Sequence, residues 1–183
     1  MVGIEAKRRW CTTFSSGGVR TAFPPDKVCG IIRRGNSLRR KTNMDVSRPP
    51  IWLMKTEPEK YSYADLARDG RTVWDGVRNN QAALYLKAMK VGDLTFIYHS
   101  VSDLAVVGVA RVVREAFIDP TDAAGRFVAV EIAPDLTLPR PVPLADMKAQ
   151  TALAGMAMFR QFRLSVSPVT PEESRVILAM GES

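Results

Sequence analysis

Two short polar stretches of the chain carry the side chains best suited to hold a planar ligand. Residues 55–58, Lys-Thr-Glu-Pro, follow an apolar run, and residues 74–82 begin with a tryptophan and continue into polar amides. Trp74 offers a flat platform, and stacking of a base on an aromatic side chain contributes about 1–3 kcal/mol. Arg78 carries a guanidinium that can bind a phosphate through two parallel hydrogen bonds. These residue types indicate a pocket for something planar, such as a nucleobase.

The second stretch also supplies groups that can read the edge of such a ligand. Asn79 and Gln81 each offer hydrogen-bond donors and acceptors, and Gly76 lets the backbone approach a ligand closely. The backbone amides at a helix start, expected near Asn79, also attract anions.

The same residues have structural explanations, which remain open from the sequence. Trp74 fits a hydrophobic core equally well, and Asp75-Gly76 is a common turn. Arg78 has the neighbouring carboxylate of Asp75 as a partner, and residues 55–58 are compatible with a solvated strand end.

A catalytic role would depend on the single histidine, His99, which stands next to Ser100. Adjacent residues of a strand point to opposite faces, so these side chains cannot easily share the hydrogen bond that nucleophilic catalysis requires. Residues 51–183 contain no glycine-rich phosphate loop, no G-x-S-x-G motif and no cysteine. We expect His99 to be a hydrogen-bonded structural residue, and an enzyme that uses it as acid or base is the alternative.

Capping residues and hydrophobic periodicity predict the elements that position these side chains. Three helices are expected over residues 62–70, 79–89 and 170–180, with helical turns at 144–153. Strands are expected over residues 51–54, 94–98, 104–114, 127–132 and 162–166. Prolines at positions 139, 141 and 143 restrict that stretch to an edge strand or a loop. Strands outnumber long helices without a βαβ rhythm, which predicts an α+β domain with a curved or barrel-like sheet.

Charge divides the chain into two unequal parts. Residues 1–50 hold 11 Lys and Arg against 3 Asp and Glu, whereas residues 51–183 hold 15 against 16. The net charge of +7 therefore belongs to the N-terminal segment, and the near-neutral remainder does not coat nucleic acid by bulk charge. Residues 1–48 fit a disordered basic arm, a targeting peptide, or translation from an upstream start codon with Met44 as the natural start. We favour the last interpretation and place one globular domain at residues 49–183.

The remaining composition limits the partners to be expected. Cys11 and Cys29 show no metal-ligand spacing, and no apolar run approaches the roughly 20 residues of a membrane-spanning helix. We expect a cytoplasmic, monomeric protein without a metal, a cofactor or a membrane partner.

Several motifs, in order along the chain, resemble those of the EVE domain family. They are WLMKTEP at 52–58, WDGVRN at 74–79, YHS at 98–100 and LSVSPV at 164–169, with weaker matches at 108–121 and 143–148. The resemblance covers nearly all of residues 51–180. Because the family is similar in fold to PUA, ASCH and YTH domains, the resemblance implies a small β-barrel of mostly antiparallel strands flanked by short helices.

The resemblance also implies a function and a site. It implies a non-catalytic module that binds a modified nucleobase, with modified cytosine in DNA as the leading candidate and a modified RNA base as the other. Carried over by position, the pocket is expected to draw on these residues: Lys55, Glu57, Pro58, Trp74, Gly76, Val77, Arg78, Asn79, Gln81, Tyr98, His99, Ser100, Arg163, Leu164 and Ser165. Trp74 is expected to stack, with Asn79 and Ser100 as readers of the base edge. Arg78 or Arg163 is expected to bind a phosphate or the base edge.

The chain departs from the family pattern at a few positions. Asn80 stands where an aromatic residue is frequent and Ala83 where Arg is frequent, which removes part of a stacking surface and one phosphate contact. Thr56 replaces a usual Ser and keeps the hydroxyl, and Ser174 replaces a usual Trp.

A further alternative is a structural or regulatory partner-binding domain, for which Trp74 would be sealed in the core.

Overall fold

Successive side chains of the first apolar run point to opposite faces of the sheet. The computed structural model describes residues 51–182, in which the run forms strand β1 (Ile51–Thr56). Trp52 and Met54 belong to one hydrophobic cluster, and Ile51 and Leu53 belong to another. Both faces of β1 are therefore covered, which is why four consecutive apolar residues can form one strand.

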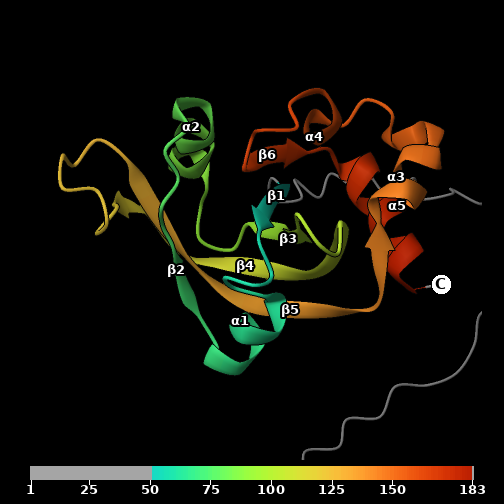
Figure 1. Ribbon diagram of the computed structural model, residues 1–183, viewed down its shortest axis with the longest axis horizontal. Coiled ribbons are helices and arrows are strands. Elements are labelled where there is room, and N and C mark those ends of the chain that lie inside the picture. The colour runs from blue at the N-terminus through green and yellow to red at the C-terminus, as the bar shows by residue number, and fades with distance from the viewer. Residues whose placement is uncertain (1–50, 183) are drawn as a thin grey trace, which may run out of the picture. The chain divides into compact units, whose positions relative to one another are not determined.

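Six strands form a single mixed sheet (Figure 1). The others are β2 (Thr72–Trp74), β3 (Leu94–His99), β4 (Ala105–Ile118), β5 (Val128–Pro143) and β6 (Val166–Val169). Their order is β2-β5-β4-β3-β1-β6, and only β1 and β3 run parallel. The α+β class is confirmed, but the described strands do not close into a barrel, because β2 and β6 form two separate edges.

Short helices cover the two faces of this sheet. They are α1 (Tyr63–Asp69), α2 (Asn80–Ala88), α3 (Leu144–Ala149), the 3-10 turn η1 (Thr151–Leu153), α4 (Ala157–Arg160) and α5 (Pro171–Glu182). Leu66 of α1 and Leu86 of α2 pack in the cluster of Trp52, whereas Met147 of α3 and Ile177 of α5 pack in the cluster of Leu53. Figure 1 shows α3, α4 and α5 gathered on the side of the sheet where the chain ends, away from α1 and α2.

The expected helix boundaries are confirmed at the capping residues. Ser62 caps α1 through a reciprocal pair of hydrogen bonds with Asp65, and the helix ends at Gly70, whose φ of 77° lies in the left-handed region. Thr170 and Glu173 form the same reciprocal pair at the start of α5, with distances of 2.8 and 3.2 Å.

Two strand predictions need comment. β5 continues to Pro143, but β2 pairs only with residues 130–132, so the proline-rich half of β5 has β4 on one side alone, as expected for an edge. The strand predicted over residues 162–166 is wrong. The amide of Leu164 donates to the carbonyl of Gln161 at 3.0 Å, which closes a turn, and β6 begins only at Val166.

Within residues 51–182, no helix is long and apolar enough to cross a membrane. The N-terminal extension predicted over residues 1–48, with both cysteines, lies outside the described residues.

We predict that Gly108→Ala destabilises the domain. A methyl group at position 108 would lie 2.5 Å from Cζ of Tyr63, whose hydroxyl donates a hydrogen bond to the Val109 carbonyl. Such overpacking costs about 1–3 kcal/mol in the free energy of unfolding, measurable by urea denaturation. Gly155→Ala is the control, because no heavy atom lies within 4 Å of its added methyl group. Equal stability of the two variants would contradict the prediction.

Candidate functional site

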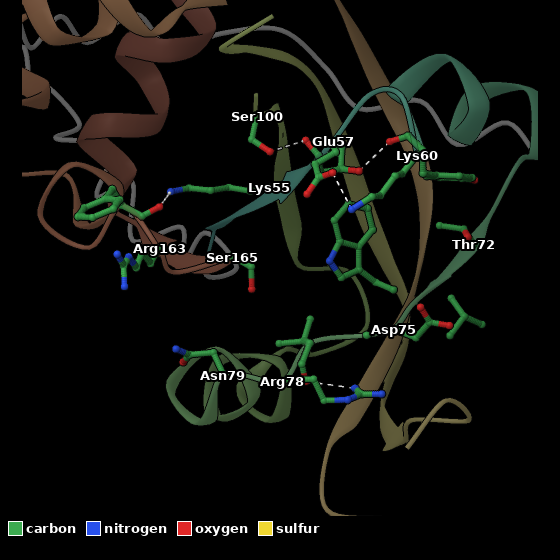
Figure 2. Close-up of a pocket in the computed structure, with 17 residues that line it drawn as sticks. Lys55, Glu57, Lys60, Thr72, Asp75, Arg78, Asn79, Ser100, Arg163 and Ser165 are labelled. Carbon is green, nitrogen blue, oxygen red and sulfur yellow. Dashed lines mark hydrogen bonds and ion pairs between the residues drawn. The ribbon is translucent and has the colours of Figure 1, made fainter. Parts of the chain in front are cut away.

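A cavity of about 820 Å³ opens where β1 and β3 end (Figure 2). Because these two strands are parallel, with Thr56 opposite His99, their carboxyl ends meet at one edge of the sheet. The chain from β2 into α2 supplies a second wall, and the loop of residues 161–165 supplies a third. The volume lies within the range of about 300–1,000 Å³ that is usual for small-molecule sites.

Ten of the fifteen predicted site residues line this cavity. They are Lys55, Glu57, Trp74, Gly76, Val77, Arg78, Asn79, Ser100, Arg163 and Ser165. Gln81 and Leu164 line a smaller cavity of about 400 Å³ that shares some of the same wall. Pro58, Tyr98 and His99 line neither cavity.

Trp74 combines the two roles that the sequence left open. It ends β2, is half-buried, and packs against the cluster that contains Trp52 and Leu66. It also lines the cavity, so the ring is not sealed in the core. A half-buried indole held by a core is a rigid platform for a planar ligand.

Lys55 enters the cavity from the end of β1. Its Nζ donates to the Phe162 carbonyl at 2.9 Å, and burial lowers the pKa of this amine. Figure 2 shows its side chain reaching from β1 towards the loop that carries Arg163. Glu57 is engaged in an exposed ion pair with Lys60 at 2.7 Å.

Two hydroxyl groups at the strand ends donate hydrogen bonds to backbone carbonyls. Ser100 Oγ donates to the Thr56 carbonyl at 2.9 Å, and Thr56 Oγ1 donates to the Tyr61 carbonyl at 2.7 Å. Both residues line the cavity, and in these positions their oxygens are left to accept from a ligand.

Asn79 is the N-cap of α2. Its Oδ1 accepts from the amides of Gln81 and Ala82 at 2.8 and 3.1 Å. Because the cap occupies the side-chain oxygen, only the NH₂ group is left to address a ligand, and it can only donate.

Arg78 lines the cavity and is also engaged by partners within the protein. Its guanidinium donates to Asp119 Oδ2 at 2.6 Å and to Thr121 Oγ1 at 2.8 Å, and lies 5.4 Å from the centre of the Phe127 ring. In Figure 2 the Arg78 side chain points away from Lys55 and Ser100. It therefore fastens residues 74–79 to the β4–β5 connection, through Asp119 rather than through Asp75.

The carboxylate of Asp119 accepts several hydrogen bonds at the β4–β5 connection. It is 1% exposed and accepts hydrogen bonds from the Gly76 amide, Arg78 and Thr121. Burial alone raises its pKa, but the hydrogen bonds from Thr121, Arg78 and Gly76 outweigh burial and lower the pKa to about 2.

Both ring nitrogens of His99 are engaged within the fold. Its Nε2 accepts from the Tyr63 amide at 3.1 Å, and its Nδ1 lies 2.9 Å from Asp103 Oδ2. Both ring nitrogens are therefore occupied, and neither faces the cavity. Tyr98 packs in the cluster of Leu53, on the opposite side of the strand.

Seven lining residues were not among the predicted set: Thr56, Lys60, Tyr61, Thr72, Val73, Asp75 and Phe162. Thr56 and Asp75 belong to the two polar stretches, so their positions in the sequence pointed to them. Phe162 lies just before the family motif that begins at Leu164, and no signal in the sequence pointed to it. Among residues 51–182, no three His, Cys, Asp or Glu side chains are grouped to bind a metal ion.

The part of the chain that forms this fold is matched by one family model, that of the EVE domain, over residues 50–180. The chain belongs to the EVE domain family. Human thymocyte nuclear protein 1 is 33% identical over 165 residues, covering 72% of this chain and 73% of that protein.

Solved structures show the same similarity. A protein from Rhodopseudomonas palustris, solved by NMR, is 46% identical with a TM-score of 0.69, covering 72% of this chain and 92% of that one. The crystal structure of human THYN1 in complex with 5-methylcytosine-containing DNA is 32% identical with a TM-score of 0.69, covering 73% of this chain and 98% of that one.

We predict that Asp119→Asn destabilises the domain in a pH-dependent way. A carboxyl whose pKa is lowered on folding stabilises the fold above its unfolded pKa of 3.8, and this contribution is lost as the pH falls towards 2. Urea denaturation should therefore show a higher free energy of unfolding for the wild type than for the variant at pH 6. Between pH 6 and pH 2 this difference should shrink by on the order of 1–2 kcal/mol. A difference that does not change with pH would contradict the assigned role.

Proposed function

We propose that this domain binds a modified cytosine of DNA in the larger cavity and carries out no chemistry on it. The observation that carries the proposal is the position of Trp74, whose ring is held by the core and yet lines the cavity. The similar human THYN1, in complex with 5-methylcytosine-containing DNA, supports modified cytosine as the ligand. Enclosing a base in such a cavity requires that it leave the base stack.

The polar groups around the cavity complement the edge of cytosine. The Asn79 NH₂ group is a donor, which suits the ring nitrogen and carbonyl oxygen of the base. Asp75 and the oxygens of Ser100 and Thr56 are acceptors, which suit the exocyclic amino group. The cavity therefore holds both kinds of partner that a cytosine edge needs.

The charge balance favours recognition through the pocket. Residues 51–183 hold 15 Lys and Arg against 16 Asp and Glu, and Arg78 is neutralised by Asp119. Few cations are left to contact phosphates, so affinity should come chiefly from the enclosed base. The side chains best placed to meet a phosphate next to that base are Lys55 and Arg163.

The alternatives receive less support from the geometry. An enzyme that uses His99 needs that ring at the ligand, whereas both of its nitrogens are bonded to Tyr63 and Asp103. A purely structural domain needs Trp74 enclosed, whereas the ring is half-buried at a cavity wall.

Trp74→Ala is the first test. Wild-type protein should bind a short oligonucleotide that contains 5-methylcytosine more tightly than its unmodified counterpart, in a fluorescence anisotropy titration. Loss of the stacking platform should weaken binding of the methylated strand by about 1–3 kcal/mol, or about 5- to 150-fold.

Leu84→Ala serves as the control, because Leu84 is exposed on α2 and lines neither cavity. Single-stranded, double-stranded and RNA versions of the probe identify the nucleic acid that is bound. The proposal fails if the wild type does not distinguish the methylated base, or if Trp74→Ala binds it equally well.

Asn79→Asp tests the donor separately from the helix cap. Asp caps a helix about as well as Asn, so the melting temperature should hardly change. The variant lacks the NH₂ donor and places a negative charge in the cavity, so affinity for the methylated strand should fall about tenfold or more. Asn80→Asp adds the same charge one residue later, outside both cavities, and should bind normally. Equal binding by both variants would exclude Asn79 from base recognition.

A further inference from the structure

The smaller cavity lies directly beside the proposed base pocket. It has a volume of about 400 Å³ and is bounded by the start of α2 and by residues 160–164. Asn79, Phe162 and Arg163 line both cavities, so the two are continuous along this wall. In Figure 2, Asn79 and Arg163 lie on the same side of the larger cavity, Asn79 at the start of α2 and Arg163 on the loop after α4.

Phe162 stands at the junction of the two cavities with its ring in solvent. The residue is 71% exposed, and its backbone carbonyl accepts a hydrogen bond from Lys55 Nζ at 2.9 Å. The Arg163 guanidinium lies 5.5 Å from the ring centre. An anchored loop thus presents an aromatic face and a cation next to each other.

The charges around this cavity are uncompensated. Arg160 donates to the Gly155 carbonyl at 2.7 Å, and neither Arg160 nor Arg163 forms an ion pair in the part of the chain that the structure describes. The other lining side chains include the amides of Gln81 and Gln161. Two guanidiniums without a carboxylate partner, an exposed ring and polar amides suit a group that is both planar and anionic, which describes a nucleotide.

We propose that this cavity is a second subsite, which holds the nucleotide next to the pocket base on the same strand. Its base stacks on Phe162, and the phosphodiester that joins it to the pocket nucleotide is bound by Arg163, with Arg160 further along the strand. This inference rests on the proposed function, because it is the occupied base pocket that places a neighbouring nucleotide here. It assigns a stacking role to Phe162 that neither the sequence motifs nor the core packing requires.

Two trinucleotides test the subsite. Both carry a central 5-methylcytosine, and one has adenines on either side, whereas the other has abasic sites that keep the phosphates and remove the bases. Phe162→Ala should weaken binding of the first by about fivefold or more and leave binding of the second nearly unchanged. Arg163→Ala should weaken both by a similar factor, because both retain the phosphate.

Ile118→Ala and Arg175→Ala are the matched controls, each exposed and outside both cavities. If Phe162→Ala weakens both trinucleotides equally, or neither, while the wild type still prefers methylated to unmethylated cytosine, the subsite is wrong and the base pocket stands. If the wild type shows no such preference, the proposed function fails and the subsite fails with it.

Discussion

The buried carboxylate of Asp119 is the constraint on which the geometry of the site depends. It accepts from the Gly76 amide, from Arg78 and from Thr121, and so joins the stretch after β2 to the β4–β5 connection. Without that anchor, residues 74–79 would be a surface loop between a three-residue strand and a helix. With it, Trp74 and Asn79 are held at one wall of the cavity. Arg78, the residue that looked most like a phosphate clamp, also holds this wall in place through its pair with Asp119.

A second constraint is the parallel pairing of β1 with β3. It brings the carboxyl ends of two strands to the same edge of the sheet, where Thr56 and Ser100 commit their hydroxyl protons to neighbouring carbonyls. Ligand sites at the carboxyl ends of parallel strands are common, because the chain leaves the sheet there and is free to vary. Here the motif at residues 52–58 runs through β1 and past its carboxyl end, and the motif at residues 74–79 lies on the stretch that leads from β2 into α2.

Local signals in the sequence predicted much of the fold, and long-range contacts explain what they missed. The caps at Ser62, Asn79 and Thr170 were recognisable because each needs only residues within one helical turn. The partner of Arg78 lies 41 positions away, which no local pattern reveals. The turn at Gln161–Leu164 contains apolar residues that resemble a strand, so the strand was expected four residues before the position where β6 begins. The sequence led to two expectations for His99: its hydrogen bonds to Tyr63 and Asp103 agree with a structural role, whereas its expected place in the pocket does not agree with the cavity lining.

The cap of α2 has a consequence for how a ligand would be discriminated. A free asparagine amide can turn over and exchange its donor for its acceptor, so it accommodates more than one base edge. In Asn79 such a rotation would release the two backbone amides of α2 from their shared acceptor, at a cost on the order of 1 kcal/mol. The side chain is therefore set to donate before any ligand arrives. The formation of the nine-residue helix α2, rather than a rearrangement when a ligand binds, determines that Asn79 presents a donor to the cavity.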